Sequence, residues 1–163
     1  MIKARRLFSV DNAFYVGYNA SNAITATQHS IFKGEMNGMT IVDSHIHIMN
    51  TNGNFAPVYA LAERLGYSQL ALQSLQCTGD LLQNTACALC KVLHPGTTYA
   101  FGGLDYATGR DYLAQAKNLR EMGFDGIKML EGKPTTRRML GKALDDPIYD
   151  AYFGYLEATG FPV

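Results

Sequence analysis

The chain has no excess of charge of either sign, and this absence excludes several kinds of partner. Its 163 residues include 14 Lys and Arg and 14 Asp and Glu, so the formal net charge is zero. Binding to nucleic acid or to an anionic membrane surface calls for a basic excess or a concentrated basic patch. We therefore expect neither nucleic acid nor a membrane among the partners of this protein.

Long apolar runs and a secretion signal are also missing. No run approaches the roughly 20 apolar residues that a helix needs to cross a bilayer. The basic start, Met1 to Arg6, is not followed by the apolar core of a signal peptide. The chain has only three cysteines, an odd number, which predicts reduced thiols and a cytoplasmic location.

Two of the cysteines, Cys87 and Cys90, form a C-x-x-C pair. A redox pair of this spacing sits where a helix begins after a strand, whereas these residues lie inside the helical apolar pattern of residues 81–90. A zinc ribbon would need a second C-x-x-C, which the chain lacks. We interpret both cysteines as small core residues on one side of a helix.

The apolar stretch at residues 41–48 carries two histidines at alternate positions, His45 and His47. Successive side chains of a strand point to opposite faces, so the two imidazoles share one face with Cα atoms about 6.6 Å apart. That spacing suits two ligands of one metal ion, since zinc binds imidazole nitrogen at about 2.0–2.1 Å. Asp43 shares their face and is placed to hold one imidazole in the required tautomer.

The alternative for this stretch is a strand whose histidines lie on a solvent-exposed face. An exposed face alternates apolar with polar residues, but here Ile41, Val42, Ile46 and Ile48 surround the histidines. The composition therefore predicts a strand that is buried on both sides. Histidines buried in such a strand need partners, which favours a metal site.

From residue 40 onward, strand-like runs alternate with helical patterns, which is typical of βα units around a parallel sheet. We expect strands at 41–48, 69–76, 98–104 and 126–130, and helices at 57–65, 80–93, 110–122 and 147–158. A fifth strand is expected at Phe161, where the chain is about to stop. Because a (βα)8 barrel usually needs about 250 residues, we expect a truncated, incomplete barrel of about four βα units.

Residues 1–38 do not share this rhythm and are rich in Asn, Ser, Thr and Ala. Lys33-Gly34-Glu35 could be encoded by a purine-rich ribosome-binding sequence, and it lies just ahead of Met36 and Met39. We expect residues 1–38 to be a leader outside the domain, either translated upstream sequence or a disordered segment. Residues 39–163 then form the folded part.

The chain resembles the amidohydrolase superfamily at Asp43-Ser44-His45-Ile46-His47, at residues 126–134 and at Leu144-Asp145-Asp146-Pro147. More narrowly, it is similar to the amidohydrolase-related branch of metal-dependent TIM-barrel hydrolases, over about residues 40–163. The resemblance implies an α/β fold of the (βα)8 TIM-barrel type. It also implies that His45 and His47 bind a divalent metal, zinc or else manganese.

The resemblance leaves the catalytic residues of this chain unassigned. In the family, further metal ligands come from the fifth and sixth strands, and an aspartate of the eighth strand handles the proton of the metal-bound water. The positions that match these strands are expected beyond Val163, the last residue of the sequence. Only the first half of the family's site is therefore expected within these 163 residues.

Other candidate site residues follow from the positions of the expected strand ends. Some superfamily members supply a lysine from the fourth strand, which makes Lys128 a candidate metal ligand or a charge that faces the substrate. Active sites of such barrels lie at the C-terminal ends of the strands, so Gln76, Asp105 and Glu131 are candidates for lining the site. Their alternative role is loop capping or solvation, and His94 is expected to be a solvated loop residue at the opposite end.

The resemblance implies hydrolysis of an amide, a lactone or a related C–N or C–O bond in a small-molecule substrate. The alternative within the same branch is metal-dependent, non-oxidative decarboxylation of an unsaturated or aromatic acid. With only two imidazole ligands, we expect weak zinc binding and little activity from this chain alone. The first and fourth strands should be unpaired edges, which favours self-association into a homo-oligomer, and the competing hypothesis is a non-catalytic folded fragment.

Overall fold

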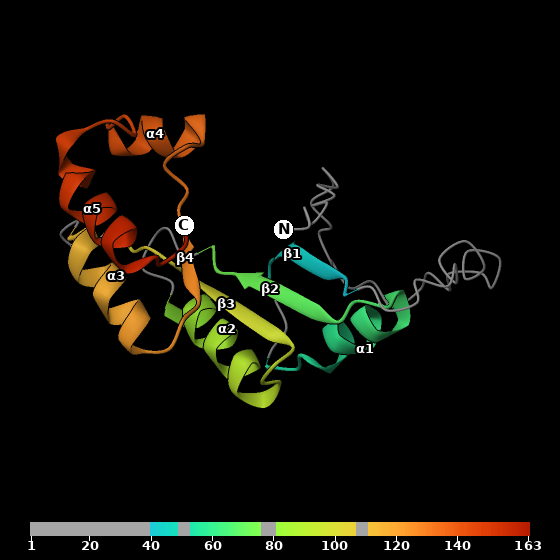
Figure 1. Cartoon of the computed structure of the whole chain (residues 1–163). Coiled ribbons are helices and arrows are strands. Elements are labelled where there is room, and N and C mark those ends of the chain that lie inside the picture. Colours follow the sequence, from blue (N-terminus) through green and yellow to red (C-terminus); the bar gives the residue numbers. More distant parts are fainter. Residues whose placement is uncertain (1–39, 49–52, 76–80, 107–110) are drawn as a thin grey trace, which may run out of the picture.

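The computed structural model describes residues 40–48, 53–75, 81–106 and 111–163. Its sheet is parallel, with strands in the order β1-β2-β3-β4. The strands are β1 (Val42–Ile46), β2 (Gln69–Gln73), β3 (Thr98–Gly103) and β4 (Gly126–Lys128). The connecting helices are α1 (Ala56–Leu65), α2 (Leu81–Leu93) and α3 (Tyr112–Glu121). Strands and helices alternate along the chain (Figure 1), which confirms the predicted α/β class and its repeated βα units.

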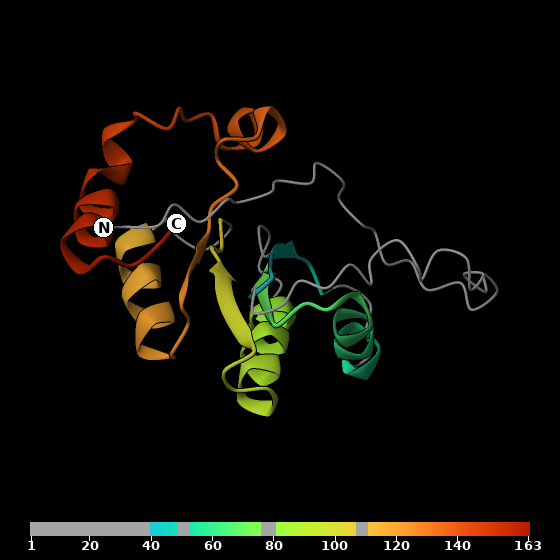
Figure 2. The same ribbon diagram turned by 45° about the vertical axis from the view of Figure 1, so that its right-hand side comes forward.

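The three connecting helices lie on one face of a curved sheet (Figure 2). Leu72, Ala100 and Ile127 point to that face and are almost completely buried in the core. The neighbouring position in β3, Tyr99, is 40 % exposed because it points to the opposite face. The helical face therefore holds the core, and Tyr99 on the other face is less covered by the described residues.

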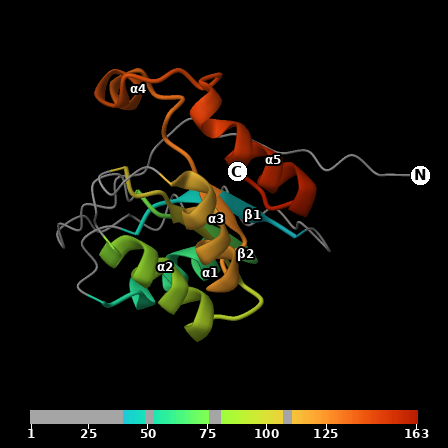
Figure 3. The ribbon, with the colours of Figure 1, turned by 90° about the vertical axis from the view of Figure 1, so that its left-hand side faces the viewer.

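Three shorter elements follow β4: the helix α4 (Pro134–Leu140), the 3-10 turn η2 (Pro147–Tyr149) and the helix α5 (Asp150–Thr159). α5 packs against α3 (Figure 3), with aromatic rings filling the contact between them. The Tyr112 ring lies 5.0 Å from that of Tyr149 and 6.2 Å from that of Tyr152, measured between centroids. These tyrosines form the part of the core that lies between α3 and α5.

The chain returns to the edge of β4 after α5. The backbone N–H of Ile127 donates to the carbonyl of Pro162 at 2.8 Å, at the position where the sequence predicts a fifth strand. A Cβ atom at Gly126 would lie 2.8 Å from that carbonyl oxygen and 2.5 Å from the Phe101 ring. Glycine at position 126 is what permits both the close backbone approach and the packing of the ring.

Two expectations about the elements are wrong. β1 is not buried on both sides: it lies at an edge of the described sheet, where Val42 is 42 % exposed and His45 is also exposed. The helix α4 is absent from the elements that the sequence predicts, because its seven residues show no apolar periodicity, and burial of Thr136 and Leu140 holds it in place. Residues 1–38 and Gln76 lie outside the described residues.

The C-x-x-C pair lies inside α2 as predicted, and both cysteines are free and buried. Burial raises the pKa of Cys87 to about 12 and that of Cys90 to about 11. Both residues therefore remain thiols at neutral pH, which argues against redox or nucleophilic chemistry there. Within the described part of the chain, no helix is both long and apolar enough to cross a membrane.

Candidate metal centre

The imidazoles of His45 and His47 meet at the C-terminal end of β1. Their Nε2 atoms lie 2.9 Å apart, and their rings are perpendicular, with an interplanar angle of 88°. Two imidazole nitrogens on one tetrahedral zinc, each about 2.05 Å from the ion, would be separated by about 3.3 Å. The contact is a hydrogen bond between the rings, so binding of one ion by both nitrogens requires a small shift of a ring and movement of the bridging proton to the other nitrogen of its imidazole.

The protonation of His47 is set by a backbone carbonyl. Its Nδ1 lies 2.6 Å from the carbonyl oxygen of Gln73, and a carbonyl can only accept a hydrogen bond. Nδ1 therefore carries the proton, and Nε2 of the neutral ring offers its lone pair. Gln73 is itself tied to β1, because its side-chain Nε2 donates to the carbonyl of Ser44 at 2.8 Å. This is the orienting contact that metal-binding histidines usually have.

Asp43, the residue predicted to hold an imidazole, contacts the backbone instead. Its Oδ1 accepts a hydrogen bond from the backbone N–H of His45 at 3.1 Å. The acceptor that orients a histidine ring is the Gln73 carbonyl. No sequence signal could have identified it, because every residue carries a backbone carbonyl.

Lys128, the last residue of β4, belongs to the same end of the sheet. Burial lowers the pKa of His45, and the charges of Lys128, His47 and Lys133 lower it further. Burial also lowers the pKa of His47, with smaller contributions of the same sign from Lys128 and Lys133, while the hydrogen bond to Gln73 opposes them. Both rings are thus held in the neutral form, which is the form that binds a metal.

Lys128 and the histidine pair lie on strands at opposite edges of the described sheet. β1 and β4 are the two edges, so in a flat sheet they would be about 14 Å apart. Exposed charges at that distance are largely screened at physiological ionic strength. The curvature seen in Figure 2 is what brings the two strand ends toward one another.

Glu131 does not line the site as predicted, because its side chain is fully buried. Its Oε2 accepts hydrogen bonds from the Tyr106 hydroxyl at 2.6 Å and from the Leu130 N–H at 2.8 Å. Burial raises the pKa of this carboxyl above its ordinary value. Glu131 thus belongs to the core. Its position just after a strand did not indicate that its side chain would point into the core.

Asp105 lies at the end of β3 and is partly exposed. Its backbone is bound on both sides by Gln115 of α3: the Asp105 N–H donates to Oε1 at 2.7 Å, and Gln115 Nε2 donates to the Asp105 carbonyl at 3.0 Å. Gln115 therefore holds the backbone of Asp105 in place just after the C-terminal end of β3.

Amide side chains from the helices hold other strand ends in the same way. Gln83 Oε1 accepts the N–H of Leu75 at 2.7 Å, just after β2. Asn84 bonds both backbone groups of Gly103, at 2.8 and 3.0 Å. Sequence reasoning missed this set, although two adjacent amides in the first turn of an otherwise apolar helix were a visible signal.

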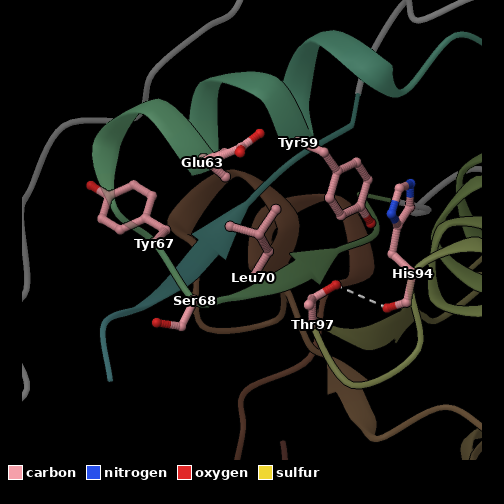
Figure 4. A pocket seen from close by; sticks show the side chains of 8 residues that line it. Tyr59, Glu63, Tyr67, Ser68, Leu70, His94 and Thr97 are labelled. Carbon is pink, nitrogen blue, oxygen red and sulfur yellow. Dashed lines mark hydrogen bonds between the residues drawn. The ribbon is translucent and has the colours of Figure 1, made fainter. Parts of the chain in front are cut away.

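A pocket of about 220 Å³ lies at the opposite end of the strands, between α1 and β2 (Figure 4). The His94 ring stacks on Tyr59 there, with ring centroids 3.5 Å apart, so His94 is not the solvated loop residue that was predicted. The Tyr59 hydroxyl bonds Thr98 Oγ1 at 2.7 Å. This pocket is far from the imidazole pair and shares no residue with it.

The site has two candidate metal ligands. No third His, Cys, Asp or Glu joins the pair in a cluster among the residues that the structure describes. A catalytic zinc usually has three protein ligands and one open position.

Comparison of the chain with protein-family models, with curated proteins and with solved structures found no match in any of the three.

Proposed function

We propose that this chain supplies two metal ligands, His45 and His47, to a metal-dependent hydrolase of the amidohydrolase-related kind. The bond that it would cleave is the C–N bond of an amide or the C–O bond of a lactone or related substrate. The observation that carries the proposal is the geometry of His47: its Nδ1–H is held by Gln73, and its Nε2 lies 2.9 Å from that of His45.

The position of the pair supports the same proposal. Both histidines lie at the C-terminal end of a strand in a parallel sheet whose connecting helices cover one face. Ligands and catalytic groups of parallel α/β folds collect at this end of the sheet.

His45 and His47 would hold a divalent metal, and Gln73 would keep His47 in the tautomer that binds it. A zinc ion in such a site lowers the pKa of its bound water to about 7 and polarises a substrate oxygen. The lysines near the pair favour neutral imidazoles and add positive charge. Because the described residues provide only two ligands, we expect weak, reversible metal binding and no appreciable turnover by this chain alone.

Calorimetric titration of the full chain with zinc tests this proposal. We expect one zinc per chain, lost in His45→Ala and in His47→Ala and retained in the control His94→Ala, whose ring stacks on Tyr59 at the other end. Absorption of the cobalt(II)-loaded chain would report imidazole ligands independently of activity. Zinc binding that survives both substitutions would show that the histidines are not the ligands.

A second candidate function is self-association, and the exposed edge of β1 favours it. β1 pairs only with β2 in the described sheet, and Val42 on it is 42 % exposed. Such an edge offers unpaired backbone groups to another strand. Light scattering tests this: a defined dimer that Val42→Lys converts to a monomer supports it, and a monomeric wild-type chain contradicts it.

A further inference from the structure

The stretch from Lys128 to Lys142, called the basic segment below, concentrates positive charge next to the imidazole pair. Its cations are Lys128, Lys133, Arg137, Arg138 and Lys142, and its one acid is Glu131. The carboxylate of Glu131 is fully buried and is hydrogen-bonded to Tyr106 and to backbone. It is therefore not available to the lysines of the segment.

Only one cation of the basic segment has an acidic partner among the described residues. Lys142 Nζ lies 3.2 Å from Asp146. Lys128 and Lys133 form no ion pair with any described carboxylate. The C-terminal end of the sheet thus carries two positive charges that no described carboxylate neutralises.

Lys91 shows how the same fold treats a lysine with a structural role. Its Nζ lies 2.8 Å from Asp125 Oδ1 and donates to the Gly123 carbonyl at 2.6 Å, although its side chain is still 32 % exposed. Lys128 is comparably placed at the other end of the sheet, and burial lowers the pKa of its ammonium group. Partial burial of a charge is costly when no partner compensates it, and no described carboxylate pairs with Lys128, so an anionic ligand would stabilise it.

Asp43, the acid whose charge acts on His45, is not the anionic partner of Lys128. Asp43 accepts from the backbone N–H of His45, and its charge acts on His45 in the direction opposite to those of Lys128 and Lys133. Strand register places His45, His47 and Lys128 on the same face of the sheet, because their neighbours Ile46 and Ile127 point to the helix-covered face. All three lie at the C-terminal ends of their strands. Such an arrangement would suit a substrate with a charged group beside its reacting bond.

We propose that Lys128, assisted by Lys133, binds an oxyanionic group of the substrate, a carboxylate or a phosphate, beside the histidine pair. The identity of the ligand as substrate rests on the function proposed above, whereas the anion site itself does not. An ammonium group offers three donors to such an oxyanion, and charge-assisted bonds of this kind are about twice as strong as neutral ones. The bound group is an anchor and does not react.

Nuclear magnetic resonance titration of the full chain tests the anion site, first with metal removed by passage over a chelating resin and then with zinc added. The probes are benzoate, phenyl phosphate and benzamide, which share a ring and differ in charge. We expect saturable shifts of the amide signals of Lys128, Lys133 and His45 with at least one anion, and binding of benzamide that is weaker by about ten-fold or more, a factor equivalent to about 1.4 kcal/mol. Tighter binding of benzoate identifies a carboxylate site, and tighter binding of phenyl phosphate identifies a phosphate site.

Variants locate the binding group. Lys128→Met should weaken binding of the better anion by about ten-fold, and Lys128→Arg by less than about three-fold, since one charged contact is removed or kept. Lys133→Met, at an exposed position that tolerates change, should weaken it by about two- to three-fold. The control Lys117→Met, on the outer surface of α3, should leave it unchanged.

Equal binding of benzamide and the anions, or unchanged anion binding in Lys128→Met, would overturn the anion site. The zinc titration tests the hydrolase proposal independently of the anion site. Zinc binding without anion binding removes only the anion site. Anion binding to a chain that does not bind zinc through its histidines leaves the anion site and removes the hydrolase.

Discussion

The two ends of the parallel sheet treat polar groups in opposite ways. At the N-terminal end of the strands, Asp125 uses both carboxylate oxygens: Oδ1 pairs with Lys91 at 2.8 Å, and Oδ2 accepts the N–H of Ala100 at 2.8 Å. At the C-terminal end, Lys128 has no acidic partner among the described residues, and His45 and His47 face one another through ring nitrogens.

This difference separates stability from function within one small sheet. Contacts that satisfy each other leave nothing to bind a ligand, and they hold strands and helices in register. A lysine without an acidic partner costs stability but is available to an anion, and two imidazoles that bond only to one another at Nε2 are available to a metal. The comparison predicts that substitution of Asp125 acts on folding, whereas substitution of His45, His47 or Lys128 acts mainly on binding.

The largest effect should come from Asp125→Ala. The variant leaves the buried N–H of Ala100 without an acceptor and removes the partner of Lys91. We expect the free energy of unfolding to fall by about 2–3 kcal/mol, the usual cost of leaving a buried polar group unsatisfied, as measured by urea denaturation. Zinc affinity should not change, and a loss of zinc binding in the folded variant would break the separation between the two ends.

Glu131→Gln should have a smaller effect of opposite sign. Burial raises the pKa of Glu131 in the folded protein, so its contribution to stability is present below the ordinary carboxyl pKa and is lost as pH rises through the folded pKa. At pH 7.5 we expect the neutral amide to be more stable by about 1 kcal/mol, because a buried Oε1 without a hydrogen-bond partner is costly when charged.

Urea denaturation at several pH values measures this difference. The advantage of the Glu131→Gln variant should disappear at about pH 4, where the wild-type carboxyl becomes protonated in both the folded and the unfolded state. Glu131→Leu is the matched control, since it removes the acceptor of Tyr106 as well and should destabilise at every pH. A constant difference between wild type and Glu131→Gln across pH would contradict a raised pKa.

The pH dependence of His47 should be weaker still. Its pKa is lowered in the folded protein, so the unfolded chain binds protons first, and stability falls as pH drops below about 6.5 toward the folded pKa. The ring is partly exposed, so we expect a loss of less than about 1 kcal/mol between pH 7 and pH 5. His47→Gln should flatten this part of the stability curve, and an unchanged curve would show that the ring does not titrate differently on folding.

The smallest effect should come from Lys142→Met. The ion pair of Lys142 with Asp146 joins residues four apart near the surface, and pairs of this kind contribute little. We expect no measurable change in the urea midpoint or in anion binding. A clear loss of anion binding would extend the proposed site along the basic segment.

Much of the fold was predictable from local sequence. Apolar runs located the strands, and the predicted ends of α1 and α5 lie within two residues of Gly66 and Gly160, which adopt left-handed backbone conformations. α4 was not predictable, because it is short and basic and depends on burial of Thr136 and Leu140. The exposure of β1 was also missed, because apolar composition does not tell whether a neighbouring strand covers an edge.

The candidate site was predictable only in part. Alternation along a strand placed His45 and His47 on one face, and the structure brings their rings together. The carbonyl of Gln73 has no sequence signature, so the contact that sets the tautomer of His47 could not be foreseen. The burial of Glu131 could not be predicted either, because the alternation of side chains along a strand does not continue past its end.

The sequence by itself determined which residues alternate on a strand, which cysteines lie in a helix, and where positive charge is concentrated along the chain. These are properties of spacing and composition, which short-range geometry translates directly into local structure. Only the tertiary structure decided that the charge of Lys128 acts on the histidines and that Glu131 does not neutralise it. Curvature of the sheet and burial against the tyrosines are set by packing between distant segments, and packing of this kind is not encoded in any single stretch of the chain.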